Sequence, residues 1–364
     1  MNRITFYILI VIFLLCSCKK NPQKSDNATI KPQDTTSSRL EPDLITEINK
    51  DNTKGWIKRS LHNDHVINII TNNKNELAAS LSQDGILSIW QTTNGKDIYS
   101  LDLDKTLQVS QFAFSHNGKY LVTIAASLEY DPESPKANGG YRIDSINVSL
   151  WQSVNGKLIK EYIINQDEPP HGIGFTLDDN FLLVRNLDRI QTYDIESGQL
   201  TRESHPYTDG DFSPQSNYSV CPAYHRSIGV WNIPKDTLLF EIKTGRDFTR
   251  TVSFPYDEKF LVSTGQDDST LKIWEMPTGT LLKTIRLEVP QVGCGNISPS
   301  GKYFAGGSIT GEVNIWDLSN GKIIQTYNDY HFYIWSVAWS PDEKQVFVGY
   351  QDGTIIGLNR NKPD

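Results

Sequence analysis

The stretch from Leu61 to Lys96, LHNDHVINIITNNKNELAASLSQDGILSIWQTTNGK, carries the pattern from which the rest of the chain is built. Apolar side chains alternate over residues 77–81 and recur over residues 86–89, a period that favours short β-strands over helix. Asp84-Gly85 separates the two runs, and Asn94-Gly95 follows the second. Both dipeptides tolerate the positive φ of tight turns between antiparallel strands. The stretch therefore predicts a small antiparallel sheet.

Weaker copies of this unit fill nearly all of the chain that follows. The residues that end the equivalent strand in successive copies are Trp90, Trp151, Tyr193, Trp231, Trp274, Trp316 and Leu358. After a first interval of 61 residues these positions are 38 to 43 residues apart, close to the period of about 40–45 residues of a four-stranded propeller blade. The spacing therefore predicts seven blades, with an insertion in the first interval.

The chain resembles the WD-repeat β-propeller family over residues 55–364, in seven degenerate repeats. The resemblance implies an all-β fold, a seven-bladed β-propeller with four-stranded antiparallel blades. In that family a hydrogen-bonded set of His, Ser or Thr, Asp and Trp holds each blade together. The matching residues are His62, Ser80, Asp84 and Trp90 in the first copy and Thr264, Asp268 and Trp274 in the fifth. His, Ser and Asp are also the residue types of a catalytic triad, but their place in this set favours a structural role.

The last copy is one strand short, because only a polar tail follows residues 353–358. Residues 55–61, GWIKRSL, have the pattern of a strand that precedes the first copy. If this strand joins the last blade, it closes the ring and removes two exposed sheet edges, which would otherwise favour aggregation. We therefore expect residues 55–61 to supply the fourth strand of blade seven, with Trp56 packed in that blade.

Residues 1–18, MNRITFYILIVIFLLCSC, have the layout of a secretory signal peptide, with one Arg, an apolar run, a small residue and a cysteine. The apolar run is shorter than the ~20 residues of a transmembrane helix. The end resembles a bacterial lipobox, and Cys18 is the expected lipidated residue because Ser17 supplies the small side chain before cleavage. This predicts a lipid-anchored protein of the bacterial cell envelope, on the periplasmic side of the outer membrane or on the surface. A secreted protein and an uncleaved anchor are the alternatives.

Residues 19–54 are polar and rich in Lys, Asp, Ser, Thr and Pro. Such a segment cannot bury enough apolar surface to offset the entropy lost on ordering, so it predicts a flexible polar tether, in which residues 40–49 could form a short helix. The chain is thus expected to consist of a lipoprotein signal peptide at 1–18, a tether at 19–54 and a propeller at 55–364.

The insertion in the first interval covers residues 128–144, LEYDPESPKANGGYRID. Two Pro, a Gly-Gly pair and mixed charge predict a loop. By the resemblance, this loop lies between the second and third strands of blade two, on the face that such propellers most often present to partners. It carries Tyr130, Tyr141 and Arg142, and it is either a functional loop or a tolerated surface insertion.

Charge and the positions of reactive residues limit the range of functions. The net charge is −8, and no basic stripe could replace the counterions of a nucleic acid. Cys221 and Cys294 fall in blades that are not neighbours, so no disulfide is expected between them. The seven His show no metal-ligand spacing, and no CxxC, CxxCH or GxSxG motif occurs. We therefore expect no nucleic-acid partner, no metal, no cofactor and no catalytic residue.

By the resemblance, one residue per blade opens onto the rim of the central channel: Ile67, Ser110, His171, Thr208, Arg250, Gly293 and Trp335. Aromatic and Arg side chains dominate interface hot spots. The predicted partner-binding residues are therefore His171, Tyr224, Arg250, Asp267 and Trp335, with Tyr130, Tyr141 and Arg142 of the insertion. Blades one and six are expected to be bland there, with Ile67, Ser82, Gly293 and Ile309. Tyr333 and Ile334 are expected to fill the core between blades seven and one.

These patterns favour a lipid-anchored propeller that binds a protein or peptide as a scaffold and has no catalysis of its own. One alternative is a propeller enzyme or cofactor-binding protein, similar to lactonases or quinoproteins, with its site in the central channel. Another alternative is a scaffold in outer-membrane assembly. A cluster of carboxylates and His in the channel would favour the enzyme, whereas an aromatic rim of mixed charge would favour binding.

Overall fold

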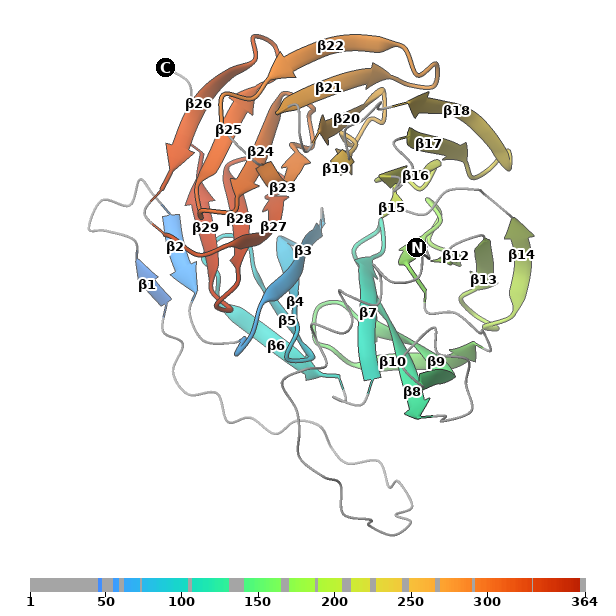
Figure 1. Ribbon diagram of the computed structural model, residues 1–364. Coiled ribbons are helices and arrows are strands. Elements are labelled where there is room, and N and C mark those ends of the chain that lie inside the picture. The colour runs from blue at the N-terminus through green and yellow to red at the C-terminus, as the bar shows by residue number, and fades with distance from the viewer. Residues whose placement is uncertain are drawn as a thin grey trace.

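The computed structural model describes residues 45–47, 55–58, 62–72, 74–103, 107–130, 141–164, 170–186, 189–204, 211–222, 227–243, 249–265, 269–289, 292–328 and 330–360. The predicted signal peptide and Cys18 lie outside this part of the chain. The described strands form seven antiparallel sheets arranged in a ring (Figure 1). The predicted all-β, seven-bladed fold is therefore confirmed. Among the described residues there is no helix with the length and apolar character needed to cross a membrane.

In blades one to six the strands follow one another from the channel outward. Blade one contains β3 (Val66–Asn72), β4 (Leu77–Ser82), β5 (Ile86–Gln91) and β6 (Asp97–Asp102), and blade two contains β7 (Leu107–Phe114), β8 (Tyr120–Tyr130), β9 (Tyr141–Gln152) and β10 (Leu158–Ile164). Blade three contains β11 (Gly172–Phe175), β12 (Phe181–Arg185), β13 (Ile190–Asp194) and β14 (Leu200–Ser204), and blade four contains β15 (Asp211–Phe212), β16 (Tyr218–Pro222), β17 (Ser227–Asn232) and β18 (Thr237–Lys243). Blade five contains β19 (Thr249–Ser253), β20 (Phe260–Gly265), β21 (Thr270–Glu275) and β22 (Leu281–Arg286), and blade six contains β23 (Val292–Ile297), β24 (Tyr303–Ser308), β25 (Val313–Asp317) and β26 (Lys322–Tyr327).

Blade seven combines the two ends of the described chain. Its strands, from the channel outward, are β27 (Ile334–Trp339), β28 (Gln345–Tyr350), β29 (Ile355–Asn359), β2 (Gly55–Lys58) and β1 (Ile45–Glu47). In the antiparallel pair of β2 and β29, Trp56 lies opposite Gly357. The N-terminal strand therefore closes the ring as predicted, and 59–61 lie outside the described residues.

The fifth strand of blade seven, β1, was not expected from the sequence. It pairs with β2 along its whole length, from Ile45 opposite Lys58 to Glu47 opposite Trp56. The suggestion of a short helix over residues 40–49 is therefore wrong. Pairing with β2 explains this outcome, because β2 would otherwise present an open edge to solvent.

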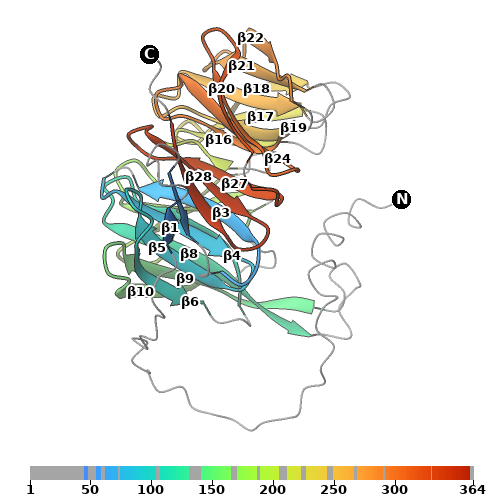
Figure 2. The same ribbon diagram turned by 90° about the vertical axis from the view of Figure 1, so that its left-hand side faces the viewer.

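The insertion in blade two begins and ends as strand rather than loop. β8 and β9 continue past the neighbouring strands, and Leu128, Glu129 and Tyr130 pair with Ile143, Arg142 and Tyr141. Figure 2 shows the far ends of β8 and β9 extending beyond the disc. The insertion does lie between the second and third strands of blade two, as predicted, but the expectation of loop over all of 128–144 is wrong, and 131–140 lie outside the described residues. Continued backbone pairing explains the difference, since a composition typical of loops does not prevent it.

The core is divided among the seams between neighbouring blades. Each of the seven buried clusters draws its residues from two adjacent blades, and the seven together account for every seam of the ring. At the seam of blades seven and one, the cluster includes Trp56, Trp90 and Phe347. A single blade cannot bury both faces of its sheet, so stability comes from stacking the repeats.

The turn between the first and second strands repeats one backbone feature in every blade. A residue with positive φ occupies this turn in each of them: Glu76, Gly118, Asp179, Ser216, Glu258, Gly301 and Glu343. Left-handed backbone costs a residue other than Gly, Asn or Asp about 1–2 kcal/mol. At Asp179, Ser216, Glu258 and Glu343 the side chain of this residue makes a hydrogen bond that glycine could not make.

Three acidic members of this series bridge to the preceding blade. Asp179 of blade three accepts hydrogen bonds from the amides of His116 and Asn117 in blade two, both at 2.7 Å. Glu258 of blade five accepts from the amide of Gln215 in blade four at 2.6 Å. Glu343 of blade seven accepts from the hydroxyl of Ser300 in blade six at 2.9 Å. These carboxylates hold neighbouring blades in register on the face where these turns lie.

Candidate functional site

The first strands of the blades carry a recurring β-bulge at the predicted rim position. In five blades the register shifts at one residue, and these residues are Ile67, Ser110, Arg250, Gly293 and Trp335. A bulge leaves its extra residue outside the ladder and re-aims that side chain. The bulge therefore explains why Ile67 and Trp335 project although they lie within otherwise buried strands.

Exposed apolar side chains gather on the rim over blades six, seven and one. The members of this rim patch, with their exposed fractions, are Ile309 (42%), Phe332 (47%), Trp335 (46%) and Ile67 (45%). Ile67 and Trp335 also line the mouth of the central channel. Exposed apolar side chains that group on neighbouring blades are candidates for an interaction site.

Half-buried aromatic rings contact two members of this patch. The ring of Tyr333 lies 5.1 Å from that of Trp335, and the ring of Tyr330 lies 5.2 Å from that of Phe332. Trp335 also meets the imidazole of His65 of blade one edge-on, at 5.4 Å. These contacts fix the orientation of the exposed rings, which lowers the entropy lost when a partner binds.

The turns of adjacent blades pack closely at the seams between blades six, seven and one. Gly353 of blade seven has a φ of 84°, and a Cβ there would lie 2.1 Å from the carbonyl oxygen of His62 in blade one. Gly311 of blade six has a φ of 90° and would clash in the same way with the carbonyl oxygen of Tyr330. Glycine is therefore required at both turns, and the two seams that carry the rim patch are closely packed.

The structure groups the predicted rim residues differently from the sequence-based expectation. Blades one and six were expected to be bland, but Ile67 and Ile309 lie in the same patch as Trp335 of blade seven. That expectation treated each blade alone, whereas blades six, seven and one are neighbours in the ring. Ile334 is buried, but in the cluster between blades six and seven, so the expectation that it fills the core between blades seven and one is wrong. Tyr333 is half-buried, and its ring lies tilted against that of Trp335.

The remaining predicted binding residues lie on other blades or outside the described residues. His171 of blade three is half-buried, and its amide donates to the carbonyl of Arg185 at 2.7 Å. Arg250 occupies the bulge of β19. Tyr224 and Asp267 lie outside the described residues, while Tyr130, Tyr141 and Arg142 are placed only as paired backbone of β8 and β9.

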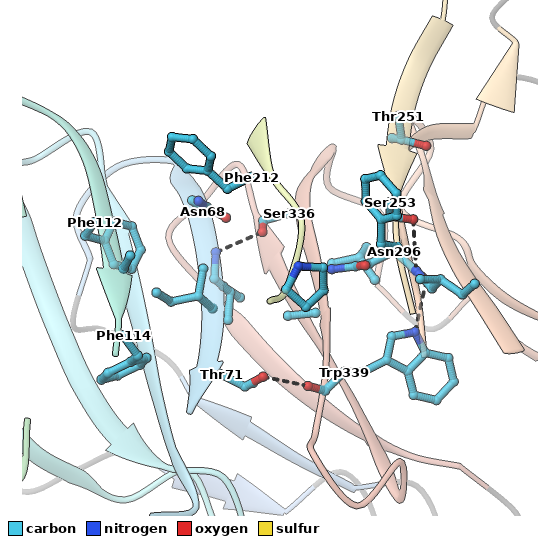
Figure 3. Close-up of a pocket in the computed structure, with 18 of the residues that line it drawn as sticks. Asn68, Thr71, Phe112, Phe114, Phe212, Thr251, Ser253, Asn296, Ser336 and Trp339 are labelled. Atoms are coloured by element: carbon cyan, nitrogen blue, oxygen red, sulfur yellow. Dashed lines mark hydrogen bonds between the residues drawn. The ribbon is translucent and has the colours of Figure 1, made fainter. Parts of the chain in front are cut away.

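The central channel has a volume of about 640 Å³ and is lined by the first strands of all seven blades. Figure 3 shows side chains of several of these strands around it. Within the described wall there is no Asp, Glu, Lys or Arg. Burial raises the pKa of the Cys294 thiol to about 12, so that this group of the wall stays protonated near neutral pH. Among the described residues, no group of three or more His, Cys, Asp or Glu could hold a metal ion.

The first blade assembles its predicted hydrogen-bonded set. The hydroxyl of Ser80 lies 3.0 Å from Nε2 of His62 and accepts a hydrogen bond from Nε1 of Trp90 at 3.2 Å. Nδ1 of His62 lies 3.6 Å from Oδ1 of Asp84, too far for a hydrogen bond but close enough for electrostatic attraction. His62, Ser80 and Trp90 are buried, so this His–Ser–Asp arrangement has no access for a substrate.

The environment of Asp84 favours its ionised form. Burial alone would raise the pKa of this carboxyl, but the facing imidazole of His62 and the amides of Asn63 and Ile86 outweigh it and lower the pKa to about 2. The two amides donate at 2.8 and 3.0 Å. A carboxylate that accepts backbone hydrogen bonds is held charged, and here it fixes the turn that leads into β5.

The fifth blade uses a different residue from the one expected. Nε1 of Trp274 donates to the hydroxyl of Ser263 at 2.9 Å, while Thr264 bonds Thr251 of the preceding strand at 2.8 Å. The two hydroxyls occupy equivalent positions in their strands. Ser80 lies two residues after Ala78, the cross-strand partner of Trp90. Ser263 likewise lies two residues after Leu261, the cross-strand partner of Trp274. The hairpin of blade five is one residue longer, which shifts the hydroxyl to Ser263. Assigning Thr264 to Trp274 is therefore wrong, and Asp268 lies outside the described residues.

Comparison with known families agrees with this architecture. The model described as "WD domain, G-beta repeat" matches residues 240–275 and 321–356. Both matches fall on repeats that the structure shows as blades of a seven-membered ring. The chain is a WD-repeat β-propeller.

The sequence repeat of this WD-repeat propeller is offset from its blades by one strand. The match at 240–275 begins in β18, the outer strand of blade four, and ends with the third strand of blade five. The match at 321–356 likewise begins at β26 of blade six and ends within β29 of blade seven. The repeat that ends in blade seven therefore lacks the outer strand of that blade, and the N-terminal strand β2 supplies it.

Curated relatives match parts of the WD-repeat region. Small ribosomal subunit protein RACK1y of Oryza sativa subsp. japonica is 25% identical over 150 residues, 39% of this chain and 44% of that protein. Apoptotic protease-activating factor 1 of Homo sapiens is 23% identical over 273 residues, 61% of this chain and 22% of that protein. U3 small nucleolar RNA-associated protein 15 homolog of Xenopus laevis is 25% identical over 219 residues, 58% and 41% of the two chains. The matched segments thus span less than half of the length of each of these relatives.

Proposed function

We propose that this chain is a lipid-anchored WD-repeat propeller that binds a protein or peptide through the rim patch and serves as a scaffold. The observation that carries the proposal is the patch itself: Ile309, Phe332, Trp335 and Ile67 lie on one rim, each more than 40% exposed. Burying this surface against a partner would be favourable by about 25 cal/mol for each Å² of apolar area.

The residue types of the patch suit a protein partner. Trp is among the residues most enriched at interface hot spots, and hot spots cluster in the centre of a contact. Trp335 lies between Tyr333 of its own blade and His65 of the next, so its ring is already held in place. A preorganised aromatic anchor of this kind loses little conformational entropy on binding.

The relatives support a role in assemblies. One is named as a protein of the small ribosomal subunit, one as a factor that activates a protease, and one as a protein associated with U3 small nucleolar RNA. None of these names is that of an enzyme. For this chain we propose a protein rather than a nucleic-acid partner, because its net charge is −8.

The anchor is part of the same proposal. Residues 1–18 have the layout of a lipoprotein signal, and lipid attachment at Cys18 would hold the propeller at the bacterial cell envelope. In a Cys18→Ala variant the protein should leave the membrane fraction or remain unprocessed, whereas Cys16→Ala should change neither property. Mass spectrometry that finds the lipid on Cys16, or finds no lipid, would contradict the anchor without affecting the binding face.

The binding face is tested with the full chain. A partner captured by crosslinking from a membrane extract is titrated by calorimetry against wild type, Trp335→Ala and a matched control, Ile324→Ala, whose side chain is 40% exposed on the outer strand β26. Trp335→Ala should weaken binding at least about ten-fold, or about 1.4 kcal/mol, and Ile324→Ala should have no effect. Equal affinities for wild type and Trp335→Ala, or loss of binding with Ile324→Ala, would place the working surface elsewhere.

A further inference from the structure

The central channel has the size and shape of a small-molecule site. Its volume of about 640 Å³ falls within the range of roughly 300–1,000 Å³ that is typical of ligand pockets. All seven first strands contribute to its wall, so its shape is fixed by the whole ring rather than by one mobile loop. The channel continues below the rim patch, since Ile67 and Trp335 belong to both.

Side-chain amides provide hydrogen-bonding groups in the wall. Asn68 and Gln111 each follow the bulge of their strand, in blades one and two, and Asn296 contributes a third amide from blade six. All three are half-exposed to the channel. Each amide can both donate and accept hydrogen bonds.

The hydrogen bonds that hold the wall together leave these amides available. Ile69 donates its amide to the hydroxyl of Ser336 at 2.9 Å, and Thr71 donates its hydroxyl to the carbonyl of Trp339 at 3.1 Å. Trp339 in turn donates Nε1 to the backbone carbonyl of Asn296 at 3.0 Å. None of these bonds, drawn in Figure 3, uses the side-chain amide of Asn68 or Asn296.

Apolar and aromatic side chains line the same channel as the amides. Phe114 and Phe212 are half-buried in the wall, and Trp335 stands at the mouth. An aromatic face packs well against the C–H face of a sugar ring, while the ring's hydroxyls need donors and acceptors such as amides. The wall thus pairs the two kinds of surface that such a ligand presents.

The described wall suits two other classes of ligand less well. A charged ligand would lose its hydration without gaining a counter-ion, because no Asp, Glu, Lys or Arg lines the described wall. A purely apolar ligand would cover Asn68, Gln111 and Asn296 and leave their amides without partners, which is costly. We propose that the channel binds a neutral sugar unit, with its ring against the aromatic side chains and its hydroxyls on these amides.

The test uses calorimetric titration of the full chain with single sugars. Glucose and N-acetylglucosamine are the neutral probes, glucuronate and glucosamine are the charged analogues, and cyclohexanol is the apolar one. At least one neutral sugar should bind in the millimolar range, and the other three compounds at least about ten-fold more weakly, equivalent to about 1.4 kcal/mol. Equal binding of glucuronate, glucosamine or cyclohexanol would overturn the proposal, as would the absence of binding by both neutral sugars.

Variants locate the site in the channel. Asn68→Leu keeps a side chain of similar size but removes the amide, and it should weaken neutral-sugar binding about ten-fold. Gln111→Leu provides the same test in a second blade if Asn68→Leu lowers the melting temperature. Ile324→Ala, on the outer edge of the disc, should have no effect.

Unchanged sugar binding by both folded amide variants would show that the sugar binds outside the channel and would refute the proposal. The proposal does not depend on the protein-binding role. Asn68→Leu should leave the affinity for a protein partner unchanged, whereas Trp335→Ala should weaken it, so the two ideas can fail separately.

Discussion

Replacement of Trp56 by Ala provides a direct test of how the ring is closed. Trp56 belongs to the short strand β2, yet its side chain is only 6% exposed. Its ring meets Trp90 of blade one at 5.3 Å and Phe347 of blade seven at 5.8 Å. One side chain from the N-terminal strand therefore joins the first and last blades.

The cost of this substitution can be worked out from that environment. Truncation of a buried Trp to Ala typically costs about 3–5 kcal/mol, through lost transfer free energy and the cavity that remains. Each aromatic pair contributes about 0.5–1.5 kcal/mol beyond its area. No hydrogen bond is lost, because Nε1 of Trp56 has no partner among the described residues. We therefore expect Trp56→Ala to lower the free energy of unfolding by about 3–5 kcal/mol, and Trp56→Phe to lower it by less than about 2 kcal/mol.

Gly357 supplies a second variant for a double-mutant cycle. It lies opposite Trp56 in the β2–β29 pair, and a Cβ at Gly357 would lie 2.3 Å from the Trp56 ring, which provides its three nearest atoms. Gly357→Ala should therefore be strongly destabilising in the wild-type chain but much less so in the Trp56→Ala chain. Neighbouring residues show coupling energies of about 0.5–3 kcal/mol in such cycles.

The measurements are urea unfolding, which gives the free energy of unfolding, and thermal unfolding, both followed by circular dichroism. The midpoint temperature of Trp56→Ala is expected to fall by roughly 5–15 °C. A Trp56→Ala domain as stable as wild type would refute the closure of the ring through this side chain. Equal costs of Gly357→Ala in both backgrounds would show that Trp56 does not occupy the space above Gly357.

Three further substitutions test the hydrogen bonds within and between blades. Asp84→Asn should lower the free energy of unfolding by about 1–3 kcal/mol near neutral pH. The pKa of Asp84 in the folded protein is about 2, below its usual value, so the ionised form stabilises the fold at higher pH. The stability difference from wild type should therefore shrink as the pH falls from about 4 to 2. Urea midpoints at several acidic pH values check this, and a constant difference would contradict it. Glu258→Ala should lower the free energy of unfolding by about 1–3 kcal/mol because two donors of blade four lose their acceptor. Glu258→Gly should recover about 1 kcal/mol of this loss, because glycine adopts the left-handed backbone without strain. Equal stability of the two variants would argue against backbone strain. Ser263→Ala should destabilise blade five by about 1 kcal/mol because it removes the hydrogen-bond acceptor of Trp274. A shift in Trp fluorescence is the readout. If Thr264→Val alters that fluorescence and Ser263→Ala does not, Thr264 rather than Ser263 is the acceptor.

Much of the fold could be predicted from local sequence alone. A turn dipeptide such as Asp84-Gly85 and the regular recurrence of Trp90 and its counterparts require only short-range geometry and counting. The missing outer strand of the last copy even predicted that residues 55–61 would close the ring. The closure could be inferred because an open propeller would leave two unpaired edges.

The details of the site were less accessible, since they depend on register and on neighbouring blades. The lengthened hairpin of blade five moves the Trp274 contact from Thr264 to Ser263, a change of one residue that spacing alone does not reveal. The rim patch needs Ile309 and Ile67 to flank Trp335, and these residues are far apart in sequence. Sequence reasoning judged each blade by its own residues and therefore missed this patch.

The sequence by itself determined the number of blades, their strand order and the residue types available at each turn, because hydrophobic period and turn chemistry act within a few residues. Only the tertiary structure decided which side chains act together. The carboxylates of Asp179, Glu258 and Glu343 look like ordinary turn residues in the sequence, yet each bonds the turn of the preceding blade. Such contacts depend on the angle between successive sheets, and that angle is set by the packing of all seven seams around the ring.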